Sequence, residues 1–431
     1  MKSYARGGLL ALGTALVMVV GASPSWAAGP VLTNPANWTP QMVAPLGAGY
    51  VRQLTPCGAN MYTVGTFSQF KSPADGGALF TRNNAMSFNG TTGKMTAFNP
   101  NTNGIVNSIA LNPADCSTAW IGGKFSTVGG QSASNIAAVD TATGALKTGF
   151  KHTAAGQVNA LLYTHGELLV GGYFSTINGV ARAKLASLNP VTGDPDSYLT
   201  LGLTGNYPGN TNPTRGYNFT LSHAGDRTLV TGDFTAVGGV HREQVFQLDL
   251  GATVATLNPW TSNDFYIHCA DSLPFYIQDA AYSPDDTAVY VATTGYKKSS
   301  DPLHTGVCDA TAAYPSTGGT VNRRWVNYTG CDSLYTVAAD ESTVYVGGHQ
   351  RWLNGENTCD RAGNGTVDRP GIGGISPVTG RATSWNPTRD RGAGADDMLF
   401  AFGGLWVGSD NQNTATQCGH EYHPGICFLP Y

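Results

Sequence analysis

Seven polar residues recur at one place in this sequence, one or two residues into runs that are typical of the first strand of a repeating unit. The series is Arg52, Asn107, Asn159, Asn218, Asp279, Asp332 and Asp397. Its last three members are carboxylates, which can bind a hard cation such as Ca²⁺ or act as a general acid and base. Side chains at strand ends can instead accept hydrogen bonds from neighbouring backbone amides, which is a structural role.

A second group of charged and aromatic residues follows in the last quarter of the chain. Arginine beside aspartate is typical of a loop network whose members satisfy one another. Aromatic rings among such pairs would also suit a sugar, because a ring stacks on its C–H face while polar groups bond its hydroxyls. The candidate ligand-binding residues are His349, Arg351, Trp352, Asp360, Arg369, Arg389, Arg391, Asp410, Tyr422 and His423.

Metal binding by this second group is not expected. His420 and His423 form an H-x-x-H spacing, and His349 and Asp410 could complete a set of zinc or copper ligands. The spacing alone is a weak signal for a metal site. We expect no cofactor. Calcium bound by Asp279, Asp332 and Asp397 is the alternative that the three carboxylates leave open.

A repeated glycine-rich phrase must position all of these residues. One copy reads Ile121-Gly-Gly-Lys-Phe-Ser-Thr-Val-Gly-Gly130, and the next reads Val170-Gly-Gly-Tyr-Phe-Ser-Thr-Ile-Asn-Gly179. Strong and weak copies begin 49 to 61 residues apart, at Val64, Ile121, Val170, Val230, Val291, Val346 and Val407. Self-similarity of this kind indicates stacked units that bury their apolar faces against one another.

Each unit contains four strand-like runs. In the third unit these are residues 158–163, 167–171 and 183–188, and a fourth run follows the turn Asn189–Gly193. A short polar side chain before Thr-Gly is typical of a hairpin turn, in which glycine takes the positive φ. Seven such units predict an all-β, seven-bladed β-propeller of four-stranded antiparallel blades.

The two ends of the chain are predicted to meet in the last blade. That unit stops after its third strand, and Ala36–Pro40 resembles the fourth-strand run Ser384–Pro387. We therefore expect residues 31–45 to complete the final blade, close the ring and cover a sheet edge.

Strand order assigns the loops to two faces. The turns between first and second strands and between third and fourth strands are short and share one face. The second-to-third loops and the blade connections are long, varied and on the opposite side, which we call the loop face. Function is expected on the loop face of blades 5–7, because loops on a rigid scaffold carry it.

The eight cysteines fit this assignment. Residues 1–27 have the charged start, apolar core and Ser25–Ala27 cleavage site of a signal peptide, which leaves 28–431 as one secreted domain. Cysteines in an exported chain should be paired. Of the 105 connectivities that eight cysteines allow, one that links no opposite faces is Cys57–Cys116, Cys269–Cys308, Cys331–Cys359 and Cys418–Cys427.

Charge disfavours some partners. Without the signal peptide the chain has 22 Lys/Arg and 28 Asp/Glu, so its net charge is −6, and the excess of acid lies in the second half. This disfavours nucleic acid and anionic membranes as partners. No second apolar run follows the signal, so we expect no membrane span, and we expect a monomer.

The phrase Gly-Gly-x-Phe-x-x-Val-Gly-Gly, followed by apolar-x-x-apolar-Asp/Asn and Thr-Gly, resembles the delta-60 repeat, a bacterial β-propeller repeat of unknown function. The resemblance covers roughly residues 50–410 and is strongest in the second to fourth units. It implies a secreted bacterial propeller and brings no catalytic motif.

Two functions fit these observations. The first is a secreted binding module that engages a carbohydrate or an extracellular protein through the loop face of blades 5–7. The alternative is an extracellular polysaccharide hydrolase or lyase, with Asp332 and Asp397 as a carboxylate pair at the mouth of the central channel. Carboxylates that face each other across an open funnel would favour the enzyme, and carboxylates bonded to backbone amides would favour the binding module.

Overall fold

The computed structural model describes residues 29–44, 49–206, 215–269, 277–296, 306–356, 358–387, 394–410, 418–419 and 421–431. These residues form an all-β fold. Its helical content within the described ranges is two short 3₁₀ segments, η1 (Pro73–Asp75) and η2 (Asn263–Tyr266). The segment 1–27, predicted to be a signal peptide, lies outside the described residues.

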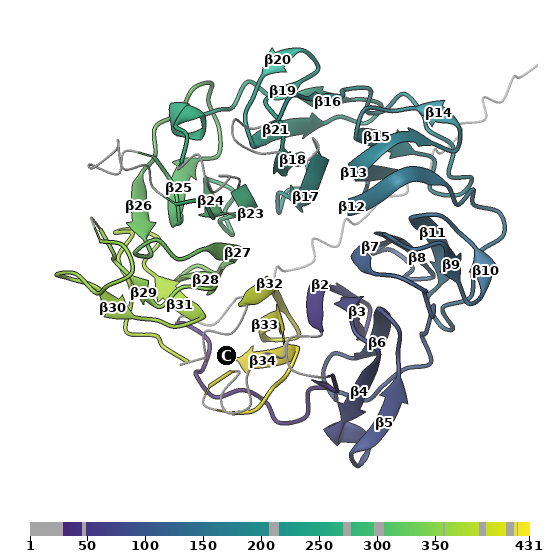
Figure 1. Cartoon of the computed structure of the whole chain (residues 1–431), viewed down its shortest axis with the longest axis horizontal. Coiled ribbons are helices and arrows are strands. Elements are labelled where there is room, and N and C mark those ends of the chain that lie inside the picture. The colour runs from purple at the N-terminus through teal and green to yellow at the C-terminus, as the bar shows by residue number, and fades with distance from the viewer. Residues whose placement is uncertain are drawn as a thin grey trace, which may run out of the picture.

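Among the described residues, seven of the antiparallel sheets lie around a common centre in Figure 1. The first three are β2 (Tyr50–Cys57), β3 (Asn60–Thr66) and β6 (Ala85–Asn89); β7 (Val106–Leu111), β8 (Thr118–Gly123) and β11 (Ile136–Asp140); and β12 (Ala154–Thr164), β13 (Glu167–Ile177) and β15 (Leu185–Leu188). A single bridge outside the named strands, such as Phe88 to Met95, marks a fourth run in each of these sheets.

The next four sheets complete the set. They are β17 (Arg215–Leu221), β18 (Arg227–Asp233), β21 (Val245–Leu250) and β22 (Ala255–Leu257); β23 (Ile277–Tyr282), β24 (Ala288–Thr293), β25 (Ala310–Pro315) and β26 (Trp325–Tyr328); β27 (Leu334–Ala339), β28 (Val344–Gly348) and β31 (Ile372–Ile375); and β32 (Ala395–Ala401), β33 (Gly404–Ser409) and β34 (Ile426–Pro430). The first strand of each sheet is innermost and contacts the first strand of the next, and β32 contacts β2.

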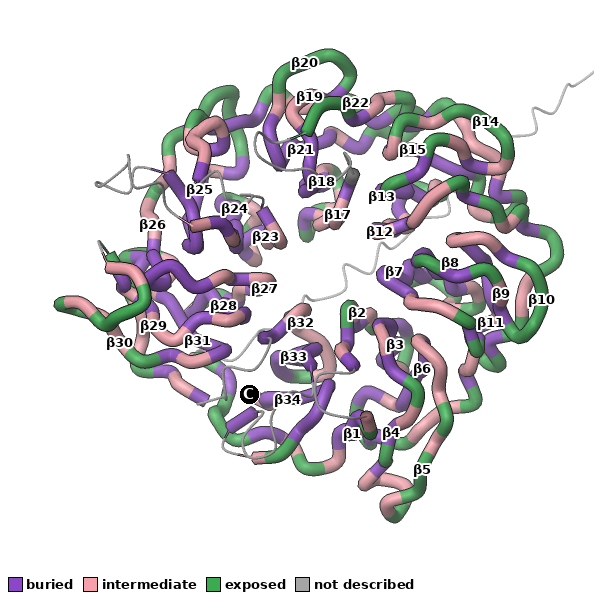
Figure 2. Tube along the Cα trace, viewed as in Figure 1, coloured by how far each residue is buried: buried purple, intermediate pink, exposed green. Residues whose placement is uncertain are grey.

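Small hairpins extend from the loops between second and third strands. They are β4 (Gln69–Ser72) with β5 (Ala78–Thr81), β9 (Thr127–Val128) with β10 (Gln131–Ser132), β14 (Val180–Ala181) with the end of β13, β19 (Ala236–Val237) with β20 (Val240–His241), and β29 (Trp352–Leu353) with β30 (Val367–Asp368). Two connections add a strand to the hairpin of the following sheet: β1 (Gln41–Met42) pairs with β4, and β16 (Leu203–Thr204) pairs with β19. Figure 2 shows that several hairpin tips, such as β14 and β20, are exposed.

The N-terminal segment lies along the outer edge of the last sheet. The backbone N–H groups of Leu32 and Ala36 donate to the carbonyls of Pro430 and Phe428 in β34, at 2.7 and 2.9 Å. Trp38 packs against Phe428, with ring centroids 5.5 Å apart. These contacts hold the segment against β34, and its role as the closing strand of the ring stays a prediction.

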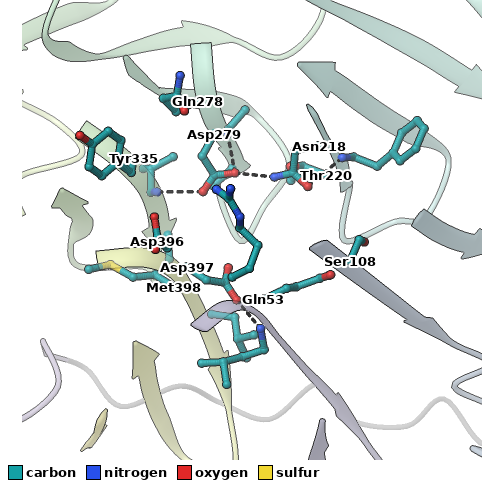
Figure 3. Close-up of a pocket in the computed structure, with 18 of the residues that line it drawn as sticks. Gln53, Ser108, Asn218, Thr220, Gln278, Asp279, Tyr335, Asp396, Asp397 and Met398 are labelled. Atoms are coloured by element: carbon teal, nitrogen blue, oxygen red, sulfur yellow. Dashed lines mark hydrogen bonds between the residues drawn. The ribbon is translucent and has the colours of Figure 1, made fainter. Parts of the chain in front are cut away.

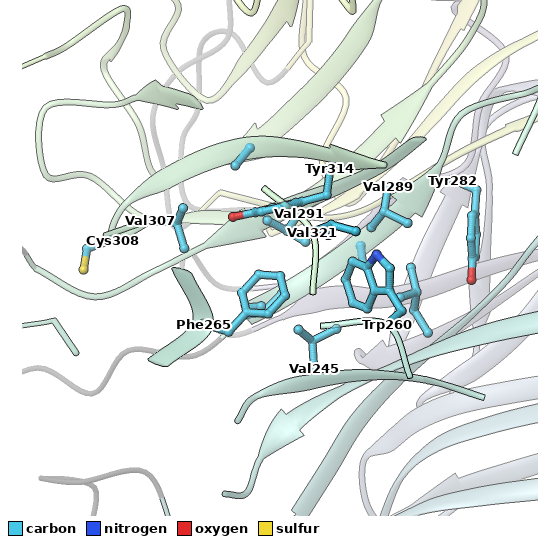
Figure 4. Packing of buried hydrophobic residues seen from close by; sticks show 14 of the residues in the cluster. Val245, Trp260, Phe265, Tyr282, Val289, Val291, Val307, Cys308, Tyr314 and Val321 are labelled. Atoms are coloured by element: carbon cyan, nitrogen blue, oxygen red, sulfur yellow. The ribbon is translucent and has the colours of Figure 1, made fainter. Parts of the chain in front are cut away.

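Apolar side chains fill the space between neighbouring sheets. Figure 4 shows the cluster between the sheets that begin with β17 and β23, where Trp260 and Phe265 are fully buried. The indole Nε1 of Trp260 donates to the carbonyl of Pro315 in the next sheet at 2.8 Å. Trp120, Trp325 and Trp385 likewise donate to carbonyls distant in sequence, so this tryptophan contact recurs around the fold.

The four predicted disulfides are confirmed: Cys57–Cys116, Cys269–Cys308, Cys331–Cys359 and Cys418–Cys427. The first joins the last residue of β2 to the turn after β7 in the neighbouring sheet. All eight cysteines are thereby paired.

Candidate functional site

Each of the seven inner strands contains a β-bulge at an equivalent position. The register to the second strand shifts across one residue, and that extra residue is Arg52, Asn107, Asn159, Tyr217, Gln278, Tyr335 or Asp396 in chain order. A bulge leaves one residue unpaired and redirects its side chain. These residues are the bulge residues below.

The predicted polar series combines three different positions. Arg52, Asn107 and Asn159 are bulge residues, whereas Asn218, Asp279 and Asp397 each follow a bulge residue. Asp332 lies outside the bulge altogether, two residues before β27 begins.

The residue after the bulge bonds most sheets to the next one. In four sheets its side chain accepts the backbone N–H of the neighbouring inner strand: Gln53 from Ile109 (2.8 Å), Ser108 from Leu161 (3.0 Å), Asp279 from Val337 (3.0 Å) and Asp397 from Leu54 (2.6 Å). The third sheet has Ala160 at this position, and the next strand's Phe219 N–H is accepted by Asn218 instead. Most polar residues at this position therefore accept hydrogen bonds from backbone N–H groups of the fold.

Two bulge residues also hold neighbouring sheets together. The amide of Asn107 donates to the carbonyl of Val158 at 3.0 Å, and that of Asn159 donates to Gly216 at 3.2 Å. Asn107 thus adds a second bond to the one made by Ser108, whereas Asn159 makes a side-chain bond to the next sheet where Ala160 cannot. The later sheets carry other residue types at the bulge.

The inner strands enclose a cavity of about 870 Å³, to which all seven contribute side chains. Four consecutive sheets supply the bulge residues Tyr217, Gln278, Tyr335 and Asp396, and Arg52 follows in the next sheet. Figure 3 shows Gln278, Tyr335 and Asp396 around one part of this space, near Asp279 and Asp397. The Nε2 of Gln278 is buried and has no hydrogen-bond partner among the described residues.

Burial raises the pKa of two cavity carboxyls. The pKa of Asp279 rises to about 6 because burial outweighs the hydrogen bonds from Val337, Thr336, Ala280 and Asn218. The pKa of Asp397 rises to about 7, mainly through burial, and the negative charges of Asp279 and Asp396 add to the effect. Raised carboxyl pKa values occur in catalytic acids and also in structural networks, and here both groups accept backbone amides.

Asp332 belongs to a separate network on the hairpin of the sixth sheet. Its buried carboxylate accepts Arg351 Nε at 2.8 Å and Nη2 at 3.1 Å. Arg351 also reaches Asp360 at 2.8 Å and lies 4.3 Å from the ring centroid of Trp352. Arg351, Trp352 and Asp360, three members of the predicted ligand-binding group, therefore lie together. Asp332 and Asp397 lie in different parts of the fold, because Asp397 lines the cavity and Asp332 does not.

Arg369 is one of four equivalent arginines, a pattern that the sequence reasoning did not use. Arg82, Arg182, Arg242 and Arg369 each follow a hairpin, and each donates one bond to the preceding carbonyl and one to a carbonyl 14 to 17 residues later. Burial lowers the pKa of Arg369. The signal was an arginine three residues before each of four third strands.

In the last sheet, His423 lies at the position that corresponds to Arg369 in the sixth sheet. It is buried, and its Nδ1 lies 3.1 Å from Thr39 Oγ1 in the N-terminal segment. His423 and Arg369 therefore serve packing between runs of one sheet, whereas Asp410 lines the cavity.

The remaining candidates lie apart from these groups. Tyr422 is exposed on the surface, where its carbonyl accepts Gln41 Nε2 at 3.4 Å. His349 is half-buried just after β28. Arg389, Arg391 and His420 lie outside the described residues.

Replacement of Arg369 by alanine is expected to lower the free energy of unfolding by about 1–3 kcal/mol, because two partly buried carbonyls lose a charged donor. Arg182→Ala should have a similar effect, since it removes the same pair of bonds from the third sheet. Urea unfolding of both variants measures this. A ligand-specific defect in Arg369→Ala with unchanged stability would contradict the structural role.

Two kinds of feature are absent from the described part of the chain. No group of three or more His, Cys, Asp or Glu side chains there could hold a metal ion. Among the same residues, no helix is long and apolar enough to cross a membrane.

One unit of this chain is similar to a known family. Residues 166–197 match DUF5122, a β-propeller domain of unknown function. The match runs from the turn before β13 to the run after β15, so it covers the middle of the third sheet. No curated protein matches the chain. The delta-60 resemblance stays a prediction.

Among solved structures, the extracellular domain described as belonging to the one component system BT4673 of B. thetaiotaomicron has 10% identity and a TM-score of 0.49. That alignment covers 91% of this chain and 39% of the other, so this chain spans less than half of that protein's length. The WD40 β-propeller domain of Doa1 has 12% identity and a TM-score of 0.43, with 90% of this chain and 96% of the other covered.

Proposed function

We propose that this chain is a secreted binding module on a closed seven-bladed β-propeller, and that it binds a carbohydrate. Closure is supported by the contact of β32 with β2 and by the bond from Leu54 N–H to Asp397. The N-terminal segment along β34 supports it at the outer edge. Four disulfides suit an oxidising extracellular compartment.

The observation that carries the proposal is the composition of the cavity at the bulges of the fourth to seventh sheets. Tyr217, Gln278, Tyr335 and Asp396 line it there, with Arg52 beside them. Hydroxyl, amide and charged groups can bond sugar hydroxyls, and tyrosine rings can stack on a sugar face. The loop-face network of Arg351, Trp352 and Asp360 lies in the sixth sheet, within the same half of the ring.

The hydrolase or lyase alternative is less well supported. It requires a carboxylate pair at the channel mouth, but Asp332 is held by Arg351. Asp279 and Asp397 accept backbone amides, an arrangement that favours binding over proton transfer. The experiment below also distinguishes a carbohydrate ligand from an extracellular protein ligand.

A panel of immobilised polysaccharides and oligosaccharides tests the proposal. The protein should bind at least one glycan and release no new reducing ends from any of them. Tyr335→Ala should weaken that binding about tenfold or more, because truncating a central aromatic contact typically has effects of this size. Tyr173→Ala, on the exposed end of β13, is the matched control and should bind normally.

Two results would contradict the proposal. Glycan turnover would favour the enzyme, most directly if Asp397→Asn abolished it. Absence of glycan binding, together with capture of a purified extracellular protein, would replace the carbohydrate with a protein ligand.

A further inference from the structure

We infer that the central cavity binds a glycoside with an apolar aglycone, whose sugar lies at the bulges and whose aglycone lies deeper along the axis. The inference rests on the proposed function and names its ligand class. It is carried by the extent of the cavity, by the change of its lining along that extent, and by its volume.

The cavity extends along the whole length of the inner strands. At the loop face it is lined by Gly49, which precedes β2, and by Asp410, which follows β33. At the opposite face it reaches the turns between first and second strands, where it is lined by His223, Pro284 and Asp340. Each inner strand runs from the loop face to the opposite face, so the position of a residue in its strand gives its depth in the cavity.

The lining changes from polar to apolar with depth. The seven bulge residues line the cavity near the loop face, and all of them carry polar groups. Three or four residues further along, the fourth to seventh sheets contribute apolar side chains that are only partly buried: Leu221, Ala281, Ala339, Leu399 and Phe400. One side of the deeper wall is therefore apolar.

The charged groups at the far end of the cavity already have partners. His223 pairs with Asp286 at 3.0 Å, and the carboxylate of Asp340 accepts the Tyr345 hydroxyl at 2.8 Å. The deep part of the cavity therefore offers a ligand its apolar wall more than its charges.

An apolar wall in an enclosed space favours an apolar occupant. Water cannot form hydrogen bonds with the side chains of Leu221 and Leu399, and moving apolar surface out of water is favourable. An aglycone supplies such surface, while the sugar of the same molecule bonds the polar groups at the bulges. A hydrocarbon alone would displace water from the bulge residues without replacing its hydrogen bonds.

The volume of the cavity is large enough for both parts of such a ligand. It is about 870 Å³, in the upper part of the range of about 300–1,000 Å³ that is typical of small-molecule sites. A sugar at the bulges therefore leaves room for an aglycone of several carbon atoms.

Calorimetric titration with methyl, butyl and hexyl glucoside, and with the same series of galactosides and mannosides, tests the inference. In at least one series, each added methylene should tighten binding about twofold to fourfold, where fourfold corresponds to full burial at about 0.8 kcal/mol per methylene. The heat-capacity change of binding should become more negative along that series, because more apolar surface leaves water.

Variants locate the effect in the deep part of the cavity. Leu399→Asn should lower the ratio of hexyl to methyl glycoside affinity about fivefold or more, because it places an amide in the apolar wall. Leu162→Asn is the matched control and should keep the ratio. Leu162 is also partly buried and lies three residues after a bulge residue, but it does not line the cavity. Thermal unfolding checks that both variants fold, and the heat-capacity series of the unmodified protein depends on neither.

The outcomes separate this inference from the proposed function. Equal affinities for methyl and hexyl glycosides in every series, or binding of a panel glycan without binding of any alkyl glycoside, would overturn the apolar aglycone and leave carbohydrate binding in place. Failure of every glycoside and of every glycan in the wider panel would overturn the proposed function itself. Binding of hexanol as tightly as the hexyl glycosides would show apolar attraction without sugar recognition and would overturn the assignment to glycosides.

Discussion

Deletion of residues 29–43 is expected to lower the free energy of unfolding by about 5 kcal/mol or more. The segment buries Val31 and Met42, each of which contributes about 1.5–3 kcal/mol when fully buried. It also supplies the backbone donors to β34, each worth about 1 kcal/mol. Native domains have only about 5–15 kcal/mol in total, so the shortened chain should be largely unfolded at room temperature.

Urea unfolding measures this loss, and a synthetic peptide of the deleted residues provides a specific rescue. Because the peptide binds the folded form, an excess should shift the unfolding midpoint back toward that of the intact chain. A midpoint that the deletion leaves unchanged would show that the last sheet does not depend on the segment.

A pair of adjacent residues offers a finer control. Val31 is 1% exposed, and Leu32 is 55% exposed. Val31→Ala should lower the stability by about 1–2 kcal/mol, because it removes two buried methyl groups, and Leu32→Ala should have little effect. A larger loss of stability in Leu32→Ala than in Val31→Ala would contradict the observed packing of the segment.

The repeat and its turns were predictable because their causes are local. In the turn Asn189–Gly193, the side chain of Asn189 accepts the backbone N–H of Val191 and Thr192, and Gly193 takes a φ of 75°. The sequence contains every participant within five residues. The disulfides were predictable for a related reason, since strand order alone placed each cysteine on a face.

The residues that line the cavity were harder to predict. A β-bulge adds one residue to a strand, and no residue type in the sequence indicates where it occurs. Counting from the start of each strand cannot distinguish Asn159, a bulge residue, from Asn218, which follows one. Asp332 was included in the predicted polar series for the same reason, because counting from an expected strand start does not locate the bulge. The partners of Arg369 were also inaccessible, because Thr383 lies 14 residues away and becomes a neighbour only when the sheet forms.

The carboxyl group of Asp397 should make the stability of the fold depend on pH in a defined direction. Its pKa in the folded state is about 7, whereas that of an aspartate in an unfolded chain is about 3.9. Between these values the folded state binds the proton and the unfolded state does not. The contribution of Asp397 to stability is therefore fully present at low pH and is lost as pH rises toward and through 7. Asp279, with a pKa of about 6, acts in the same direction.

Comparison of Asp397→Ala with the unmodified protein isolates this contribution from all other titrating groups. The variant leaves the Leu54 N–H, now 2.6 Å from Asp397 Oδ2, without its acceptor. At pH 4.5 it should therefore be less stable by about 1–3 kcal/mol. The difference should shrink or change sign by pH 8, with a swing of about 2 kcal/mol or more, because the unmodified protein must then bury a charge near Asp279 and Asp396. A difference that is constant across this range, or that grows with pH, would mean that the Asp397 carboxylate is stabilised in the folded state and that the cavity is less negative than its lining implies.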